Sequence, residues 1–439
     1  MILLLTDTIT PRLQYIAEFI FKENWNVEYL VTTDIKDFKT ADGIRINYTP
    51  EEIPGEVINV QGSRLLFEKK TYPQYIEIFD LNGLTAFFKN KKGIGHFPFD
   101  IFSATFYLLT RYEEYLPHTT DKYQRYDYQQ SLAAANGFLK IPLINLWLQL
   151  FAEYIKSKFS GFSIQQNDFR FSPTYDVDVA YGWLGKGFIR NMGKFFSLLS
   201  RQEYDNISKG FKVLSRKEKD PFDNFKQLDQ LHEQYNLKPQ YFFLVAKNLA
   251  RYDRNIDPLN EEMQTLIRRY ARKNEAAIHP SFFTFQNEKL LKEEKFLLEE
   301  IAGVTIYKSR QHYLRFSLPE TYRNLINAGI KDEYSMGYGT VNGFRASYAN
   351  SFFWYDVERE EKTNLKIHPF CYMDSNAIFH ENLKPGQALE ELNYFYNTCK
   401  NVNGTFISVM HNHLMGTDNQ QWKDVYESFL TEINKRLSV

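Results

Sequence analysis

The sequence predicts an α/β fold in which a smaller α/β unit precedes a larger unit organised as a (β/α) barrel. At 439 residues, the chain is long enough for two or three domains of roughly 100 to 200 residues each. Near residue 168 the apolar pattern changes, and beyond it short apolar runs alternate with helical stretches, which is typical of βαβ units and a parallel sheet. We therefore divide the chain into residues 1–165 and 166–439, with an insertion at about 184–220.

The first unit opens with apolar residues 2–5, which predict a strand. An amphipathic helix follows, because Leu13, Ile16, Phe19 and Ile20 recur at helical spacing. Residues 27–31 predict a second strand, and 99–115 and 143–155 have the spacing of packed helices. No chemical motif stands out in this accessory unit, so its role stays open.

The second unit has strand candidates at 241–245, 276–278, 304–307 and 406–410. Helices are predicted between them at 225–235, 262–273 and 288–301, and Gly303 lies just past the last, where helices commonly end. Strands and helices alternate, as a parallel sheet requires.

The composition of the chain limits which partners and which cellular compartment we expect. A net charge of −1 indicates no surface suited to a polyanion, so we expect no nucleic acid partner. The spacing of Cys371 and Cys399 fits neither a disulfide framework nor a zinc knuckle. The start of the chain has no basic leader, and no apolar run reaches the roughly 18 residues of a membrane span. A cytoplasmic protein is expected.

Two carboxylates, Asp176 and Asp178, close the apolar-flanked segment 172–178. Residues two apart on a strand share a face, so one carboxylate could hold a metal ion while the other takes a proton from the attacking water. The alternative is an end-of-strand turn in which the two aspartates cap backbone amides.

Further polar residues lie at or just after the ends of the other predicted strands. Parallel strands place such residues at one edge of the sheet, where α/β proteins build their sites. Any one of these histidines could instead be a hydrogen-bonded core residue, but together with the aspartates they predict one site. The residues concerned are His279, Arg310, His312 and His411.

Residues 174–178 resemble the Thr-Phe-Asp-Asp-Gly motif of the polysaccharide deacetylase family, the metal-dependent carbohydrate esterases with a NodB-homology domain. The resemblance covers roughly residues 170–439. It implies a catalytic unit folded as a deformed (β/α) barrel of the polysaccharide deacetylase type. It also implies that Asp176 is the catalytic base and Asp178 a metal ligand.

Residues 275–280 resemble the second family motif, His-Ser/Thr-x-x-His-Pro. His279 matches its second histidine, whereas Glu275 stands in place of the first. The third metal ligand is therefore Glu275 or a residue elsewhere, and we prefer His312. Glutamate at this position could equally be a solvated surface residue.

Residues 309–313 resemble the third motif, Arg-x-Pro-Tyr, so Arg310 is expected to orient Asp176, and Tyr313 is retained. Residues 343–348, which contain Arg345, compete for this assignment but come after a further predicted helix. Residues 408–413 resemble the last motif, in which His411 is the general acid and His413 a substitute.

The resemblance implies a metal-dependent hydrolase of amide bonds that removes N-acetyl groups from an amino sugar or glycan. The cofactor would be a divalent metal ion, zinc by default, although an Asp-His-His set also accepts iron, cobalt, nickel or manganese. Two alternatives stay open: a catalytically inactive glycan-binding protein, and a deacylase of a small amide or nucleotide sugar. A carbohydrate is the expected partner. For residues 186–219 an amphipathic insertion covering the barrel is preferred over contact with a membrane surface.

Overall fold

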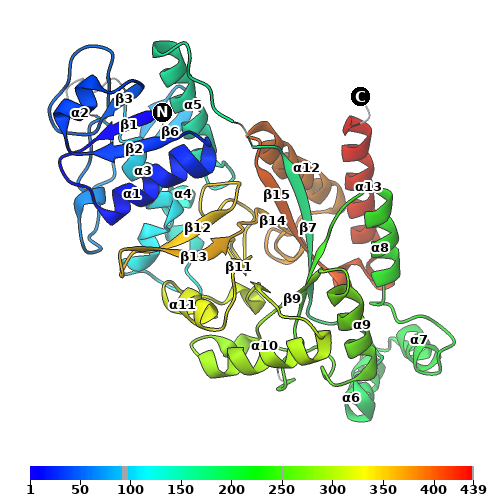
Figure 1. Cartoon of the computed structure of the whole chain (residues 1–439). Helices are drawn as coiled ribbons and strands as arrows, with labels where there is room; N and C mark the ends of the chain where they lie inside the picture. Colours follow the sequence, from blue (N-terminus) through cyan, green and yellow to red (C-terminus); the bar gives the residue numbers. More distant parts are fainter. Residues whose placement is uncertain (91–96, 166, 250, 438–439) are drawn as a thin grey trace.

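A computed structural model describes residues 1–90, 97–165, 167–249 and 251–437 (Figure 1). It has a mixed α/β fold, which confirms the predicted class. A four-stranded sheet has the order β2-β1-β3-β4, a nine-stranded sheet has the order β12-β13-β11-β10-β9-β8-β7-β15-β14, and β5 (Phe79–Leu81) pairs with β6 (Leu84–Ala86). The small sheet lies in the first predicted unit and the large sheet in the second.

The small sheet is parallel and centred on β1 (Ile2–Leu5), whose four residues are all buried. Its neighbours are β2 (Tyr29–Thr32) and β3 (Ile44–Asn47), and β4 (Ile58–Asn59) completes it. Helix α1 (Pro11–Ala17) begins where Thr10 Oγ1 accepts a hydrogen bond from the Leu13 amide, and a π-helix over Glu18–Asn24 continues it. A short helix, α2 (Ile35–Thr40), follows β2.

The helix predicted over residues 99–115 is shorter in the structure. Helix α3 (Ile101–Leu109) ends early, because Arg111 takes a left-handed conformation with φ of 56°, and a 3₁₀ turn follows at Tyr112–Tyr115. The predicted helix at 143–155 is confirmed as α5 (Leu143–Lys158), and α4 (Leu132–Ala135) precedes it.

The first strand of the large sheet along the chain is β7 (Arg170–Val177). Strands β15 (Thr405–His411) and β8 (Gln240–Phe243) lie on either side of it and run parallel to it. Strands β9 (Ala276–Ile278), β10 (Lys308–Ser309), β11 (Asp332–Glu333) and β13 (Glu361–Ile367) continue the parallel order, and β12 (Phe352–Asp356) is antiparallel at one edge. The other edge is β14 (Tyr372–Met373).

The prediction of a strand at residues 304–307 was wrong. The strand in this region is β10, which begins at Lys308. Two apolar residues of the predicted run, Val304 and Tyr307, are 47% and 43% exposed, and the Ile306 amide donates to Glu299 Oε1. Most of the apolar run therefore follows the end of the preceding helix, and only the Tyr307 carbonyl reaches the sheet, where it accepts from the Asp332 amide at 3.0 Å.

Helices connect the strands of the large sheet. The predicted helices are confirmed as α8 (Phe225–Gln234), α9 (Glu261–Ala271) and α10 (Glu288–Ala302), and Gly303 follows α10 with φ of 70°. The others are α11 (Glu320–Asn327), α12 (Pro385–Asn401) and α13 (Gln420–Leu437). Within the described ranges the outer strands β12 and β14 do not pair with each other, so closure into a barrel stays a prediction.

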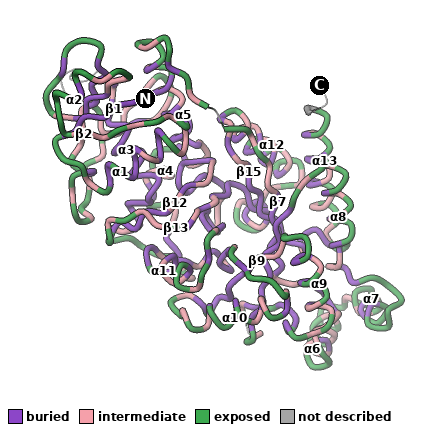
Figure 2. The backbone as a smooth tube through the Cα atoms, viewed as in Figure 1, coloured by how far each residue is buried: buried purple, intermediate pink, exposed green. Residues whose placement is uncertain are grey.

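The two predicted units share one hydrophobic core. Figure 2 shows buried backbone running from the small sheet into the large one, and a single cluster of buried apolar residues includes Ile16 and Trp354. Polar contacts also join the units: Tyr15 Oη donates to the carbonyl of Phe353 at 2.7 Å. We keep 1–165 and 166–439 as a proposed division into two units that pack as one body.

The insertion forms two helices, α6 (Gly187–Ser200) and α7 (Tyr204–Leu214), at the periphery of the molecule (Figure 1). Elsewhere, Cys371 and Cys399 are buried with their sulfur atoms 3.9 Å apart, although 28 positions separate them in the sequence. Among the helices of the described ranges, none combines the length and the apolar character needed to cross a membrane.

Candidate metal centre

The carboxyl ends of four parallel strands bring the predicted residues together. Asp176 lies near the end of β7, level with His411 on β15. His279 directly follows β9, and Arg310 directly follows β10. Asp178 is the first residue after β7, and His312 lies two residues beyond Arg310. All six predicted site residues therefore meet at the carboxyl end of the large sheet.

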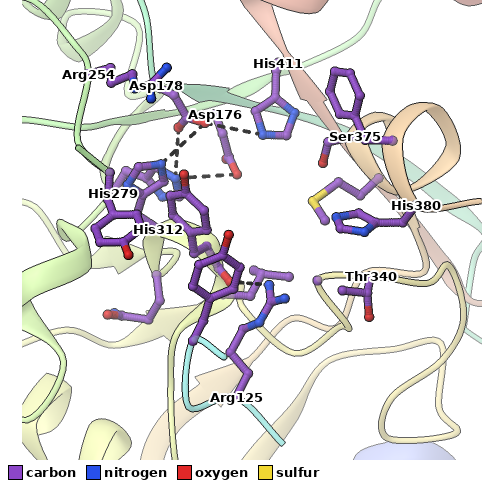
Figure 3. A pocket seen from close by; sticks show the side chains of 18 of the residues that line it. Arg125, Asp176, Asp178, Arg254, His279, His312, Thr340, Ser375, His380 and His411 are labelled. Atoms are coloured by element: carbon purple, nitrogen blue, oxygen red, sulfur yellow. Dashed lines mark hydrogen bonds and ion pairs between the residues drawn. The ribbon is translucent and has the colours of Figure 1, made fainter. Parts of the chain in front are cut away.

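Asp178, His279 and His312 form the centre of this cluster (Figure 3). One ligand atom from each residue lies within 4.8 Å of the others. His279 Nε2 is 3.1 Å from Asp178 Oδ1, and His312 Nε2 is 3.6 Å from Asp178 Oδ2. Both histidines are buried, and the Asp178 side chain is 17% exposed.

The orientation of these side chains suits a cation. His279 Nδ1 lies 2.5 Å from the carbonyl of Arg310, and His312 Nδ1 lies 2.7 Å from Asp253 Oδ1, so each ring is fixed through Nδ1 by an acceptor. The two Nε2 atoms are left facing the Asp178 carboxylate, whose buried Oδ1 has no hydrogen-bond partner among the described residues. Nitrogen lone pairs and a carboxylate that converge in this way are the donor set of a zinc-type site with open positions. The residues present fit a divalent ion.

Asp176 lies beside this cluster and is held by Arg310. Arg310 Nη1 donates to Asp176 Oδ1 at 2.7 Å and Nη2 donates to Thr174 Oγ1 at 2.9 Å. The guanidinium is completely buried and lies 4.2 Å over the ring of Phe242, which limits its freedom to move. The other carboxylate oxygen, Oδ2, is 3.8 Å from His279 Nε2. Arg310 is therefore a positioning residue, and one oxygen of Asp176 is left facing the site.

His411 lies on the other side of Asp178, with its Nε2 3.6 Å from Asp178 Oδ2. Asp374 holds this histidine twice: its Oδ1 is 2.6 Å from His411 Nδ1, and its Oδ2 accepts from the His411 amide at 2.7 Å. The pairing fixes the ring with Nε2 toward the cluster, the arrangement of an imidazole that delivers or removes a proton.

Burial and mutual contact shift the pKa values of the site. Burial lowers the pKa of His312, but the carboxylates of Asp178 and Asp253 outweigh it and raise the value to about 9. For His411, burial likewise lowers the pKa, and Asp374 together with Asp178 raises it to about 10. Burial would raise the pKa of Asp178, but the surrounding histidines hold it well below its usual range. The site thus stabilises the positive charge of His312 and His411 and the negative charge of Asp178.

The alternatives left open by the sequence lie elsewhere. Glu275 precedes β9 and lines a separate cavity together with Asp229, so the structure does not bring it to the metal cluster. Arg345 is buried against Glu114 at 2.6 Å and does not contact Asp176. His413 does line the pocket, 5.6 Å from the His411 ring between centroids, where burial and His411 lower its pKa to about 4.

A pocket of about 870 Å³ opens over the cluster. Figure 3 shows Asp178, His279 and His312 on one side of it and Thr340, Ser375 and His380 on the other. The first unit contributes part of the wall through Asp121, Lys122, Tyr123 and Arg125. A second cavity of about 350 Å³ shares six lining residues with the first and extends the space; these are Asp121, Arg125, Leu314, Gly339, Thr340 and His380.

Aromatic rings line one wall of the pocket. Tyr313 packs against Tyr123 with ring centroids 5.1 Å apart, and Tyr252 lies edge-on to Tyr313 at 5.8 Å. Arg125 Nη1 donates to the carbonyl of Tyr313 at 2.8 Å, which ties the first unit to this wall. Such rings offer flat apolar faces next to polar hydroxyl groups.

Sequence reasoning missed Asp253, Asp374 and the segment 121–125. Asp374 follows the short apolar run of β14, so its position after a strand was a usable signal. Asp253 lies in a polar connection with no periodic pattern, and the segment 121–125 lies in a unit without a motif. Nothing in the local sequence indicates that these last two approach the site.

A family model described as a family of unknown function (DUF7033) matches residues 2–160. No curated protein matches the chain. Among solved structures, Puue allantoinase has a TM-score of 0.38 and 10% identity, covering 61% of this chain and 84% of its own. A probable polysaccharide deacetylase from Pseudomonas aeruginosa PAO1 has a TM-score of 0.37 and 11% identity, covering 61% and 85%. A polysaccharide deacetylase from Bacillus cereus has a TM-score of 0.30 and 12% identity, covering 60% and 88%. All three TM-scores are below 0.5, so these similarities do not establish a function.

Proposed function

We propose that the protein is a metal-dependent hydrolase of amide bonds that removes N-acetyl groups from an amino sugar or glycan. The observation that carries this proposal is the convergence of Asp178, His279 and His312 beside a fixed carboxylate and a fixed imidazole. A divalent ion at such a site supplies Lewis acidity toward the acyl oxygen and makes water more acidic. Zinc suits this donor set, although the set does not select strongly among divalent metals.

Asp176 is assigned as the general base and His411 as the general acid. Arg310 holds one oxygen of Asp176 by a hydrogen bond and leaves the other facing the site, from which it takes a proton from the attacking water. His411 is kept in place by Asp374 and delivers a proton to the departing amine through Nε2. The two groups act at opposite stages of amide cleavage, so both are needed.

The shape of the pocket supports a saccharide substrate over a small amide. Its volume of about 870 Å³ lies in the range that holds drug-sized ligands, and the second cavity lengthens it. The rings of Tyr123, Tyr252 and Tyr313 provide faces on which sugar rings can stack. A chain of two or more sugar units would occupy both cavities.

Metal content is the first test. Elemental analysis of the purified protein should find close to one divalent ion per chain, and His279→Ala and His312→Ala should both lose it. His380→Ala is the matched control, because this histidine lines the same pocket on the opposite wall and should leave the metal content unchanged. A wild-type protein that takes up no ion, even after incubation with zinc, would refute the proposal and favour a glycan-binding protein.

Activity on acetylated chito-oligosaccharides is the second test. Asp176→Asn keeps the shape of the side chain and an oxygen that accepts from Arg310, so metal should stay bound. Release of acetate should nonetheless fall by about 10² to 10⁴, the usual contribution of a general base. Unchanged activity in this variant, with metal bound, would exclude Asp176 as the base.

A further inference from the structure

Helices α6 and α7 expose a cluster of large apolar side chains. Of the 22 such side chains that are clearly exposed among the described residues, seven fall within residues 188–214. Phe188 and Ile189 are 79% and 85% exposed. Single exposed apolar residues are ordinary, but a contiguous patch marks a binding surface. We name this patch the α6–α7 surface; it comprises Phe188, Ile189, Phe196, Leu199, Tyr204, Phe211 and Leu214.

These side chains lie together because of helical spacing. On α6, Phe188, Phe196 and Leu199 fall within one face, and on α7 Tyr204, Phe211 and Leu214 do the same. The helices pack on each other where the rings of Phe195 and Phe211 stack, with centroids 4.6 Å apart.

The pair of helices is fixed to the body at a glycine. A Cβ atom at Gly210 would lie 2.5 Å from the ring of Trp183, so only glycine allows this close approach. Trp183 is itself buried, and Lys194 Nζ lies 3.7 Å over its ring. The two helices are therefore fixed in place at the edge of the molecule (Figure 1).

The same segment is strongly basic. Residues 186–219 contain nine Lys and Arg and three acidic residues, a balance of +6 in a chain whose net charge is −1. Lys209, Lys212 and Arg216 are paired with Asp418, Glu218 and Glu262, respectively. Arg201 and Lys217 are exposed and form no ion pair with any described residue. Lys186, Arg190 and Lys194 also have no ion-pair partner among the described residues, but they are half-buried, and Arg190 and Lys194 donate to backbone carbonyls. The segment that carries the apolar patch thus has an excess of positive charge, with Arg201 and Lys217 exposed and unpaired among the described residues.

We propose that the α6–α7 surface docks the protein on a bilayer that contains anionic phospholipids. Apolar side chains on two short helices can enter the headgroup region, while lysines and arginines at their margin meet the lipid phosphates. A second copy of this chain is a poorer occupant, because it would bring the same excess of positive charge against the patch.

The docking surface adjoins the rim of the pocket. Arg190 on α6 donates to the carbonyls of Asn255 at 2.8 Å and Arg254 at 2.6 Å, and Arg254 lines the pocket. A docked molecule therefore holds its pocket mouth close to the bilayer, where a saccharide attached to a lipid would be presented. The docking itself does not depend on the proposed hydrolase activity.

Vesicle co-sedimentation of the full chain tests the proposal. We expect binding to vesicles made of equal parts phosphatidylcholine and phosphatidylglycerol, and weaker binding in high salt. The double variant Phe188→Ser and Ile189→Ser should lower the partition coefficient by roughly a hundredfold, about tenfold for each apolar side chain. Arg201→Gln with Lys217→Gln should lower it by roughly fivefold for each charge.

The matched control is the double variant Tyr75→Ser and Phe296→Ser. These two side chains are 86% and 61% exposed and lie outside the α6–α7 surface. Its binding should equal that of the wild type, and circular dichroism should show that all variants are folded. Equal loss in control and test variants, or no preference for anionic vesicles, would overturn the proposal. So would a dimer in sedimentation analysis that the Phe188→Ser and Ile189→Ser variant abolishes, because the surface would then join two copies of the chain.

Discussion

A buried ion-pair network joins the two units, and breaking it should destabilise the whole protein. Arg345 Nε and Nη2 donate to the two oxygens of Glu114 at 2.9 and 2.6 Å, and Arg111 Nε donates to Glu114 Oε1 at 2.7 Å. The side chains of Glu114, Arg345 and Arg111 are at most 3% exposed. Since Glu114 belongs to the first unit and Arg345 to the second, this ion pair is one of the polar contacts that join the two units.

The change that tests this is Glu114→Gln, which keeps the size of the side chain and removes its charge. Burial raises the pKa of Glu114, but Arg345 and Arg111 outweigh it and lower the value from 4.5 to about 2. At about 1.4 kcal/mol per pKa unit, this corresponds to roughly 3 kcal/mol of stability at neutral pH. Removing one partner of a buried pair costs about 3 to 5 kcal/mol, because the remaining charge is left uncompensated. Here that charge is Arg345, since Arg111 keeps its ion pair with Glu113 at 2.7 Å. We expect a loss of about 3 kcal/mol or more in the free energy of unfolding.

Guanidinium chloride unfolding at neutral pH, followed by tryptophan fluorescence and by circular dichroism, measures this loss. The control is Glu358→Gln, which breaks a half-exposed pair with Arg323 and should cost less than about 1 kcal/mol. Replacing both Glu114 and Arg345 by methionine should recover part of the stability lost in Glu114→Gln. Equal midpoints for Glu114→Gln and the control would refute the reasoning.

The same network has a pH signature with a definite sign. The pKa of Glu114 is depressed in the folded protein, so its contribution is fully present above about pH 4.5 and is lost as the pH falls toward 2. The difference in stability between wild type and Glu114→Gln should therefore shrink over that window. A difference that stays constant from neutral pH to pH 3 would contradict the assignment.

Three further predictions concern the site and the core. Asp374→Asn should lower kcat for acetate release by about 10² to 10⁴ with metal still bound, because His411 loses the carboxylate that fixes it; full activity would remove His411 as the acid. Burial lowers the pKa of His232, which hydrogen-bonds Tyr175 at 2.8 Å, to about 4, so stability is present above pH 6.5 and is lost as the pH falls toward 4. His232→Leu should flatten this slope in urea unfolding of the metal-free protein, and an unchanged slope would argue against it. Chelation should lower the midpoint of thermal unfolding and zinc should restore it, since an ion that binds only the folded state stabilises that state; no shift in calorimetry would mean that no ion binds.

The sequence by itself determined several strands and helices of the second unit and the composition of the site, whereas strands β11 to β14 and helices α12 and α13 were not predicted. Strand ends could be read because each buried run stops at a polar residue, and parallel strands carry those residues to one edge. Asp176, Asp178, His279 and His411 were found in this way, and the structure brings them together. Local composition was misleading at residues 304–307, where the apolar run follows a helix and the strand begins only at Lys308.

Only the tertiary structure decided which distant residues support the site. Asp253 and Asp374 fix His312 and His411 from 59 and 37 positions away, and a linear pattern carries no record of such a pairing. The approach of Arg125 to Tyr313 likewise depends on how the two units pack. Residues on one strand or helix have positions set by local geometry, whereas contacts between elements depend on how the whole core fills space. For this reason the sequence predicted the residues that carry the chemistry of the site. It did not predict the residues that line the pocket or that hold the two histidines in place.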